Sequence, residues 1–187
     1  RHVMIKSITP RDNVCLAARD LDNDGHVEIA IGANWNPGET NDTTQSGAVF
    51  YLLRPQDPRS LWRAVPIQPF DPTTHRMHWV RWRDNDFRLV VLPLHGRGNR
   101  SGEGAAVCVT AYRIPLDTPD QATAEVIHDS MHMTHNFDFE SRPPSEGDIL
   151  WIGGREGVHT VSSQETRTEL PNPVSQGAGE VRRAGVT

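Results

Sequence analysis

The chain has 187 residues, of which 36% are hydrophobic and 23% are charged, a balance typical of a soluble globular protein. Its net charge of −5 and the lack of a basic run argue against a nucleic-acid-binding surface. No apolar stretch approaches the ~20 residues that span a bilayer, so the sequence predicts no membrane segment. Short apolar runs, separated by 14 prolines and 15 glycines, predict an all-β fold of many short strands.

The first predicted hairpin carries an acidic loop. The segment Asp20-Leu21-Asp22-Asn23-Asp24-Gly25-His26-Val27-Glu28 places three carboxylates at alternating positions, with a fourth acid after a glycine turn. Ca²⁺ takes about 6–8 oxygen ligands, and glycine permits the turn that surrounds it. Apolar segments 14–18 and 29–32 suit strands, whereas helices flank an EF-hand loop. We expect Ca²⁺ to bind the following residues: Asp20, Asp22, Asp24, His26 and Glu28. The alternative is an acidic hairpin turn without a metal.

A pattern of roughly 60 residues repeats along the chain. His75-Arg76-Met77-His78-Trp79 recurs 57 residues later as His132-Met133-Thr134-His135-Asn136. Apolar strands of equivalent position are predicted at 28–32, 89–93 and 149–153. Third strands are predicted at 47–53, 105–112 and 157–161, and fourth strands at 62–65 and 124–127.

Four strands per unit are typical of a β-propeller blade. The sequence therefore predicts one propeller fragment over residues 1–187, with approximate blades at 10–70, 71–127 and 128–176. A further blade is expected to begin at 177–187. Closed propellers have about 4–8 blades, so we expect part of a longer protein, or else a chain that closes by oligomerising. The alternative fold is a β-sandwich with coincidental internal similarity.

The Asp20–Glu28 loop between two strands resembles the FG-GAP/VCBS class of propeller repeat, in which such loops bind calcium. Several segments are also similar to the propeller domain of aldos-2-ulose dehydratase and its bacterial relatives: 31–38, 75–79, 92–98, 131–137 and 154–158. The resemblance covers residues ~1–183. It implies a propeller paired with cupin-type domains, acting on oxidised sugars with the help of divalent metals.

Two His-x-x-His pairs and His95 are the candidate catalytic residues. Residues three apart on a strand point to opposite faces, so one pair cannot bind one ion from a regular strand. Equivalent positions of neighbouring blades meet at a propeller's channel, which predicts that His75 contacts His132, or that His78 contacts His135. We expect a metal or sugar site there, with His75 and His132 binding Zn²⁺ or another divalent ion. The alternative is a set of structural histidines.

Three loop residues are expected to bind a carbohydrate ligand. Trp35 follows a strand and suits stacking on a sugar, although it could instead be a packed loop anchor. Arg97 lies in the glycine-rich segment 96–104, which departs from G-x-G-x-x-G and leads into a strand, so a nucleotide cradle is disfavoured. Glu156 is one of the acids nearest the predicted channel.

Two functions remain open from the sequence. In the first, the chain is the metal-binding propeller portion of a sugar dehydratase, a lyase acting on aldos-2-uloses, and a histidine removes the proton α to the carbonyl. In the second, it is a non-catalytic, calcium-stabilised propeller that binds carbohydrate or protein. The repeated histidines favour the first, with the remaining blades and a cupin-like domain as partners. The calcium loop fits an extracellular or periplasmic setting.

Overall fold

The computed structural model describes residues 4–171, which form strands joined by loops and one short 3₁₀ helix. The elements in chain order are β1 (Lys6–Ser7), β2 (Cys15–Arg19), β3 (Glu28–Gly32), β4 (Val49–Leu53), β5 (Leu61–Pro66), β6 (Thr74–Arg83), β7 (Asp86–Pro93), β8 (Val109–Arg113), η1 (Pro119–Gln121), β9 (Thr123–His128), β10 (Thr134–Glu140), β11 (Ile149–Gly154), β12 (Gly157–Val161) and β13 (Thr166–Pro171). The all-β prediction is confirmed for this part of the chain, which contains no α-helix.

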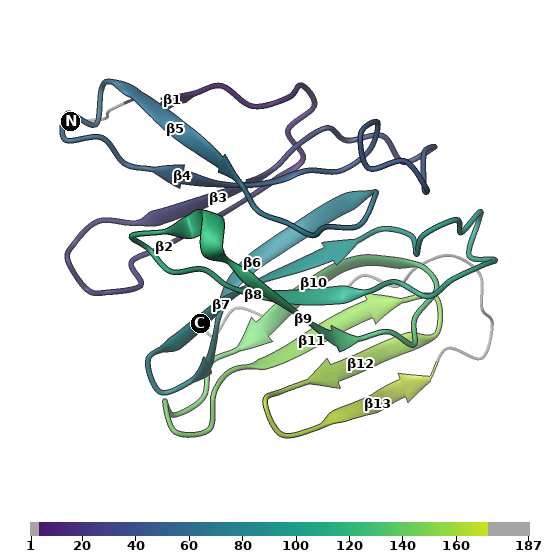
Figure 1. Ribbon diagram of the computed structural model, residues 1–187. Coiled ribbons are helices and arrows are strands. Elements are labelled where there is room, and N and C mark those ends of the chain that lie inside the picture. The colour runs from purple at the N-terminus through teal and green to yellow at the C-terminus, as the bar shows by residue number, and fades with distance from the viewer. Residues whose placement is uncertain (1–3, 172–187) are drawn as a thin grey trace.

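The strands form three sheets, each from strands consecutive in the chain (Figure 1). The sheets are β2 to β5, β6 to β9 and β10 to β13, and every consecutive pair within them is antiparallel. Strand β1 extends the first sheet by pairing in parallel with β5. The predicted second, third and fourth strands overlap the observed ones, and β13 is an addition that the sequence patterns did not indicate.

The sheets span residues 15–66, 74–128 and 134–171. His128 is the last residue of β9 in the second sheet, whereas the prediction placed it at the start of the next unit. The further unit predicted at 177–187 lies outside the described residues.

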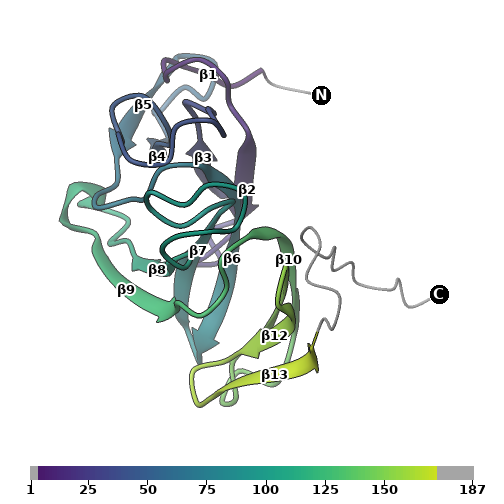
Figure 2. The ribbon, with the colours of Figure 1, turned by 90° about the vertical axis from the view of Figure 1, so that its right-hand side faces the viewer.

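The three sheets stack face to face as layers (Figures 1 and 2), so the two-layer sandwich considered above does not describe them. One buried apolar cluster joins the first two sheets and includes Ala30, Tyr51 and Trp79. A second cluster joins the last two sheets and includes Val80, Phe137 and Ile152. Alternation along β6 explains how it serves both layers, because successive side chains such as Trp79 and Val80 point to opposite faces.

The first strands of the three sheets lie next to one another. Strand β6 contacts β2 on one side and β10 on the other. At the far end of β6, the backbone N–H of Arg81 donates to the Asp148 carboxylate of the third sheet at 2.9 Å. The same carboxylate lies 3.8 Å from the guanidinium of Arg19 at the end of β2. Asp148 therefore links all three sheets at one buried point, where it is 1% exposed.

Candidate functional site

The acidic loop connects β2 and β3, which pair as a regular hairpin from Cys15–Gly32 to Arg19–Glu28. Carboxylate oxygens of Asp20, Asp22 and Glu28 lie within 4.8 Å of one another. Backbone donors hold the carboxylates in place: Gly25 N–H donates to Asp20 at 3.0 Å, and Leu21 N–H donates to Glu28 at 2.7 Å. Gly25 adopts φ +84°, the left-handed conformation that glycine tolerates best.

The electrostatics of this triad suit a bound cation. The Asp20 Oδ1 atom is buried and has no hydrogen-bond partner in the structure. Burial raises the pKa of Glu28, and the nearby charges of Asp22 and Asp24 raise it further, against the lowering effect of the Leu21 N–H. A cation would neutralise these like charges and satisfy the free oxygen. Within residues 4–171 this is the one group of three or more acids, histidines or cysteines with converging ligand atoms, and it could hold a metal ion.

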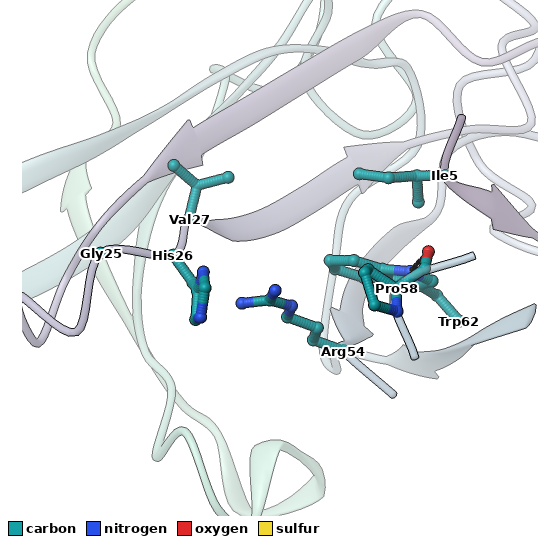
Figure 3. A pocket seen from close by; sticks show the side chains of 7 residues that line it. All are labelled: Ile5, Gly25, His26, Val27, Arg54, Pro58 and Trp62. Atoms are coloured by element: carbon teal, nitrogen blue, oxygen red, sulfur yellow. Dashed lines mark hydrogen bonds between the residues drawn. The ribbon is translucent and has the colours of Figure 1, made fainter. Parts of the chain in front are cut away.

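Two predicted ligands lie outside the triad. The Asp24 carboxylate instead closes the local turn by accepting the His26 N–H at 2.7 Å. The exposed His26 side chain faces Arg54 across an open groove of about 280 Å³ that Val27 and Trp62 also line (Figure 3). The acidic residues of the loop therefore have two roles. Asp24 closes the turn, whereas Asp20 and Asp22 converge with Glu28.

We expect Asp22→Ala to abolish stabilisation of the protein by calcium. A ligand at about 100 times its Kd stabilises the folded state by about 2.7 kcal/mol, and the substitution removes one of three converging carboxylates. The melting temperature is measured with calcium and with chelator. Asp57→Ala, which removes an exposed turn carboxylate elsewhere, should leave the calcium-dependent shift unchanged. If calcium raised the melting temperatures of the parent and of Asp22→Ala equally, the placement of the ion at this triad would be wrong.

The histidines meet in a pairing that differs from both predicted ones. His75 contacts His135, with ring centroids 5.1 Å apart, and it contacts Trp35 on its other side at 4.9 Å. His132 is instead bonded to Glu156, whose Oε1 lies 2.9 Å from its Nδ1. His78 packs edge-on against Phe137 at 4.9 Å. The predicted pairs His75–His132 and His78–His135 are therefore replaced by His75–His135.

Strand register explains this difference. Strand β6 begins at Thr74 and β10 at Thr134, so the structural repeat here is 60 residues and not the 57 of the His-x-x-His match. In both strands the register shifts directly after the first residue, which makes His75 and His135 the extra residues of equivalent β-bulges. A bulge re-aims its side chain, and here it turns both imidazoles toward one another. Strand β2 pairs with β3 without such a shift.

His75 is buried, at 8% exposure, yet neither ring nitrogen has a hydrogen-bond partner. Burial, together with the smaller effects of the charges of Arg76 and His135, lowers the pKa of His75 to about 4. The ring is therefore neutral at neutral pH, with one donor and one acceptor free. Buried polar atoms are nearly always paired, so an unpaired ring beside an aromatic side chain is a natural binding position for a polar ligand.

His95 lies close to this position. Its main chain is tied to the start of β6 through Thr73 Oγ1, which accepts the His95 N–H at 3.1 Å, and it forms a β-bridge with Met133 just before β10. Its Nδ1 atom is buried without a partner, and burial lowers the pKa of the ring. His95 and Met133 line an open cleft of about 630 Å³ together with Thr40 and Arg100. We name Trp35, His75, His95 and His135 the hub cluster.

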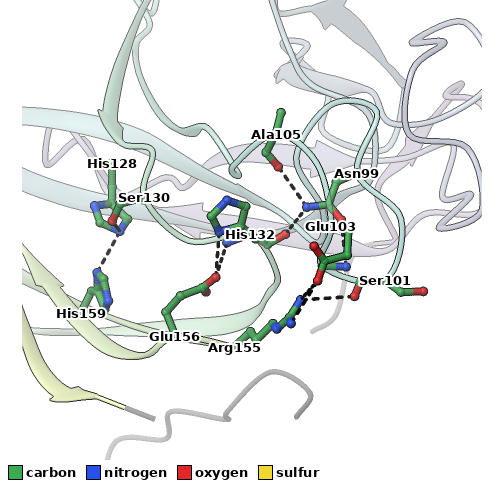
Figure 4. Close-up of polar contacts among 11 residues, drawn as sticks. Asn99, Ser101, Glu103, Ala105, His128, Ser130, His132, Arg155, Glu156 and His159 are labelled. Atoms are coloured by element: carbon green, nitrogen blue, oxygen red, sulfur yellow. Dashed lines mark hydrogen bonds and ion pairs between the residues drawn. The ribbon is translucent and has the colours of Figure 1, made fainter. Parts of the chain in front are cut away.

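The other predicted ligand-binding residues already have protein partners. Arg97 donates to the Asp71 carboxylate at 2.8 Å and to the Asn41 carbonyl at 3.0 Å. Glu156 accepts from both the ring and the backbone N–H of His132. Figure 4 shows this contact beside a second pair of rings, His128 and His159, which no sequence pattern singled out.

Searches against models of protein families and against curated proteins found no match to this chain. None of the described residues belongs to a helix long and apolar enough to cross a membrane.

Proposed function

We propose that this chain is the propeller portion of a carbohydrate-active lyase, a metal-dependent dehydratase of the FG-GAP/VCBS class that acts on aldos-2-uloses. Three successive sheets, each containing four antiparallel strands, support the propeller, and the strands β2, β6 and β10 of these sheets are adjacent. The hub cluster would then face the central channel. The remaining blades and a cupin-like domain complete the proposed parent protein.

The observation that carries the proposal is the pair of unpartnered nitrogens of His75 between Trp35 and His135. An indole face stacks on the apolar side of a sugar ring, and imidazoles bond its oxygens. The same three side chains therefore offer both kinds of contact that a sugar needs. The adjacent cleft at His95 gives the rest of the ligand room.

The proposed reaction removes the proton α to the sugar's carbonyl and expels the β-hydroxyl as water, leaving a carbon–carbon double bond. His135 is the proposed base, because the low pKa of His75 makes that ring a poor proton acceptor at neutral pH. His75 instead donates a hydrogen bond to the carbonyl oxygen. If His75 instead held a divalent ion, that ion would take the place of this hydrogen bond and would polarise the carbonyl.

Ca²⁺ is the proposed ion of the acidic triad, since three carboxylates suit a hard cation. Its role is structural. The Glu28 carbonyl accepts from the Trp79 indole of the second sheet at 3.2 Å, so an ordered loop also supports the contact between the first two sheets.

The second candidate function is a non-catalytic, calcium-stabilised propeller that binds carbohydrate or protein. One observation favours it: within the described residues, the hub histidines do not form a group of three converging metal ligands. Binding of the sugar without elimination would support this alternative.

Calorimetric titration with 2-keto-glucose, and with glucose for comparison, tests the proposal in the presence of calcium. We expect the keto sugar to bind more tightly and to yield a conjugated, ultraviolet-absorbing product. His75→Gln should weaken binding about tenfold or more, equivalent to about 1.4 kcal/mol. The matched His26→Gln, at an exposed position, should bind like the parent. Equal binding of both sugars, or equal effects of both substitutions, would contradict the proposed site.

A further inference from the structure

The stacked sheets have two kinds of face, which the middle sheet shows together. Leu89 and Val91 of β7 belong to the apolar cluster shared with the first sheet, so they mark the face toward the preceding sheet, which we name the receiving face. Val90, between them, belongs to the cluster shared with the third sheet and marks the opposite face, which we name the giving face. Within residues 4–171 no further sheet lies against the receiving face of the first sheet or the giving face of the third (Figures 1 and 2).

The receiving face of the first sheet is apolar across four strands. Ala30 packs toward the second sheet, so its neighbours Ile29 and Ile31 point to the opposite, receiving face. Leu16, on the same face, is 58% exposed. Strands that are apolar on both faces are typical of sheets that are covered on both sides. The strand registers place two rows of residues on this face, none of them polar: Leu16, Ile31, Phe50 and Pro66 in one row, and Ala18, Ile29, Leu52 and Ala64 in the other.

The repeated packing of the sheets indicates what fits this face. Leu89 of β7 and Leu150 of β11 lie on the receiving faces of the second and third sheets, and both are 0% exposed. In each case the giving face of another sheet of this chain covers them. The receiving face of the first sheet therefore suits a giving face, and among the described sheets only the third has a giving face without a neighbour.

Trp151 of β11 marks the giving face of the third sheet. It lies between Leu150 and Ile152, which both pack toward the second sheet, so its indole points the other way. Its cross-strand neighbours on that face are Asp138 and Thr160. Trp151 is only partly buried, and aromatic residues of this kind are enriched where two protein surfaces meet.

The charges beside the two faces are of opposite sign. Trp62, part of the apolar cluster on the receiving face of the first sheet, also lines the groove that contains Arg54 (Figure 3). The giving face of the third sheet carries Asp138 instead. Opposite charges favour contact between a giving and a receiving face over contact between two like faces.

We infer that the receiving face of the first sheet binds the giving face of the third sheet in a second copy of this chain, and that two copies close into a ring of six sheets. Head-to-tail contacts of this kind form either a closed ring or an open filament. Propellers have about 4–8 blades, a range that two copies satisfy and three copies exceed. The inference rests on the propeller of the proposed function and identifies its remaining blades as those of the second copy. Two hub clusters would then face one channel.

Light scattering during size-exclusion chromatography of the full chain tests the inference. We expect twice the mass of one chain, which is 20.9 kDa. Leu16→Lys and Trp151→Lys should each weaken the dimer about tenfold or more, because each buries an unpaired charge at both interfaces. Val126→Lys is the matched control, at a position 53% exposed in the outermost strand of the middle sheet, and it should dimerise like the parent.

A mixture of Leu16→Lys and Trp151→Lys tests the head-to-tail arrangement. One interface of the mixed ring carries both lysines and the other carries neither, so mixing should recover dimers that neither variant forms alone. If Trp151→Lys alone dimerised like the parent, two like faces would be in contact and the inference would be wrong.

The mass of the parent decides the matter if either variant fails to fold. A monomeric parent, or one that forms longer assemblies, would overturn the inference. A monomer that still binds the keto sugar would leave the proposed function intact, whereas a dimer that binds no keto sugar would contradict the proposed function alone.

Discussion

Replacing Gly147 with alanine is expected to lower the free energy of unfolding by about 3–5 kcal/mol, the range of the most damaging single substitutions. Gly147 has φ +77°, and a Cβ atom there would lie 2.1 Å from the carbonyl oxygen of Trp82 and 2.8 Å from its carbonyl carbon. Both are backbone atoms of β6, so the clash cannot be relieved by rotating a side chain. Urea unfolding of the parent and variant measures the difference.

The position of Gly147 makes the backbone hard to move. The next residue, Asp148, donates its N–H to the Arg81 carbonyl at 2.7 Å and accepts the Arg81 N–H at 2.9 Å. Its carboxylate also lies near Arg19 of the first sheet. Shifting Gly147 away from Trp82 would therefore disturb the buried link among the three sheets, where an unpaired carboxylate is costly.

Gly38→Ala is the matched control for this prediction. The nearest atom to a Cβ at Gly38 is the Asn36 side-chain oxygen at 3.6 Å, an ordinary contact distance. This variant should unfold at the parent's urea concentration. If Gly147→Ala also does so, the close approach of the second and third sheets described above is wrong.

Acidification is expected to destabilise the protein between pH 6.5 and pH 4. Five histidines have pKa values below the usual value, in each case chiefly because of burial: His75, His78, His95, His128 and His159. Well above pH 6.5 these rings are neutral in both the folded and the unfolded protein, so they do not make the free energy of unfolding depend on pH. As the pH falls through 6.5, the unfolded chain takes up protons that the folded protein does not, so stability is lost.

Of these five histidines, His75 should account for the largest part of the stability lost on acidification. Lowering the pKa from 6.5 to about 4 corresponds to at most roughly 3 kcal/mol, lost progressively as the pH falls to about 4. His75→Phe, which cannot titrate, should flatten the dependence of unfolding free energy on pH, measured by urea titrations from pH 7.5 to 4.5. His26→Phe, at an exposed position, should leave the slope as in the parent. Identical slopes for the parent and His75→Phe would show that the ring is not held neutral by burial.

Strand positions could be predicted from the sequence because short apolar runs and turn residues are local signals. Segments such as 28–32 and 157–161 coincide with β3 and β12. The acidic hairpin was also recognisable, since its ligand spacing and its glycine lie within one loop. The sequence could not show that Asp24 lies outside the converging triad, because aspartate is favoured both for closing turns and for binding metals in such loops.

The histidine contacts could not be predicted, for two physical reasons. The His-x-x-His motif recurs after 57 residues whereas the strands repeat after 60, so the match of His75 to His132 concealed the structural equivalence of His75 and His135. The bulges that turn both rings toward one another have no distinctive sequence either. The pairing of His128 with His159 arises from the stacking of two sheets, and neither residue has an equivalent in the repeat pattern. Side-chain contacts between layers depend on the packing of whole sheets.

Histidine NMR during titration with 2-keto-glucose tests the central claim most directly, which is that the hub cluster is the ligand site. The ring resonances are assigned by single substitutions such as His75→Gln, and the titration is made in calcium. We predict that the His75 and His135 resonances shift together in proportion to binding, while that of His26 stays in place. An unchanged His75 resonance at saturating sugar would contradict the account.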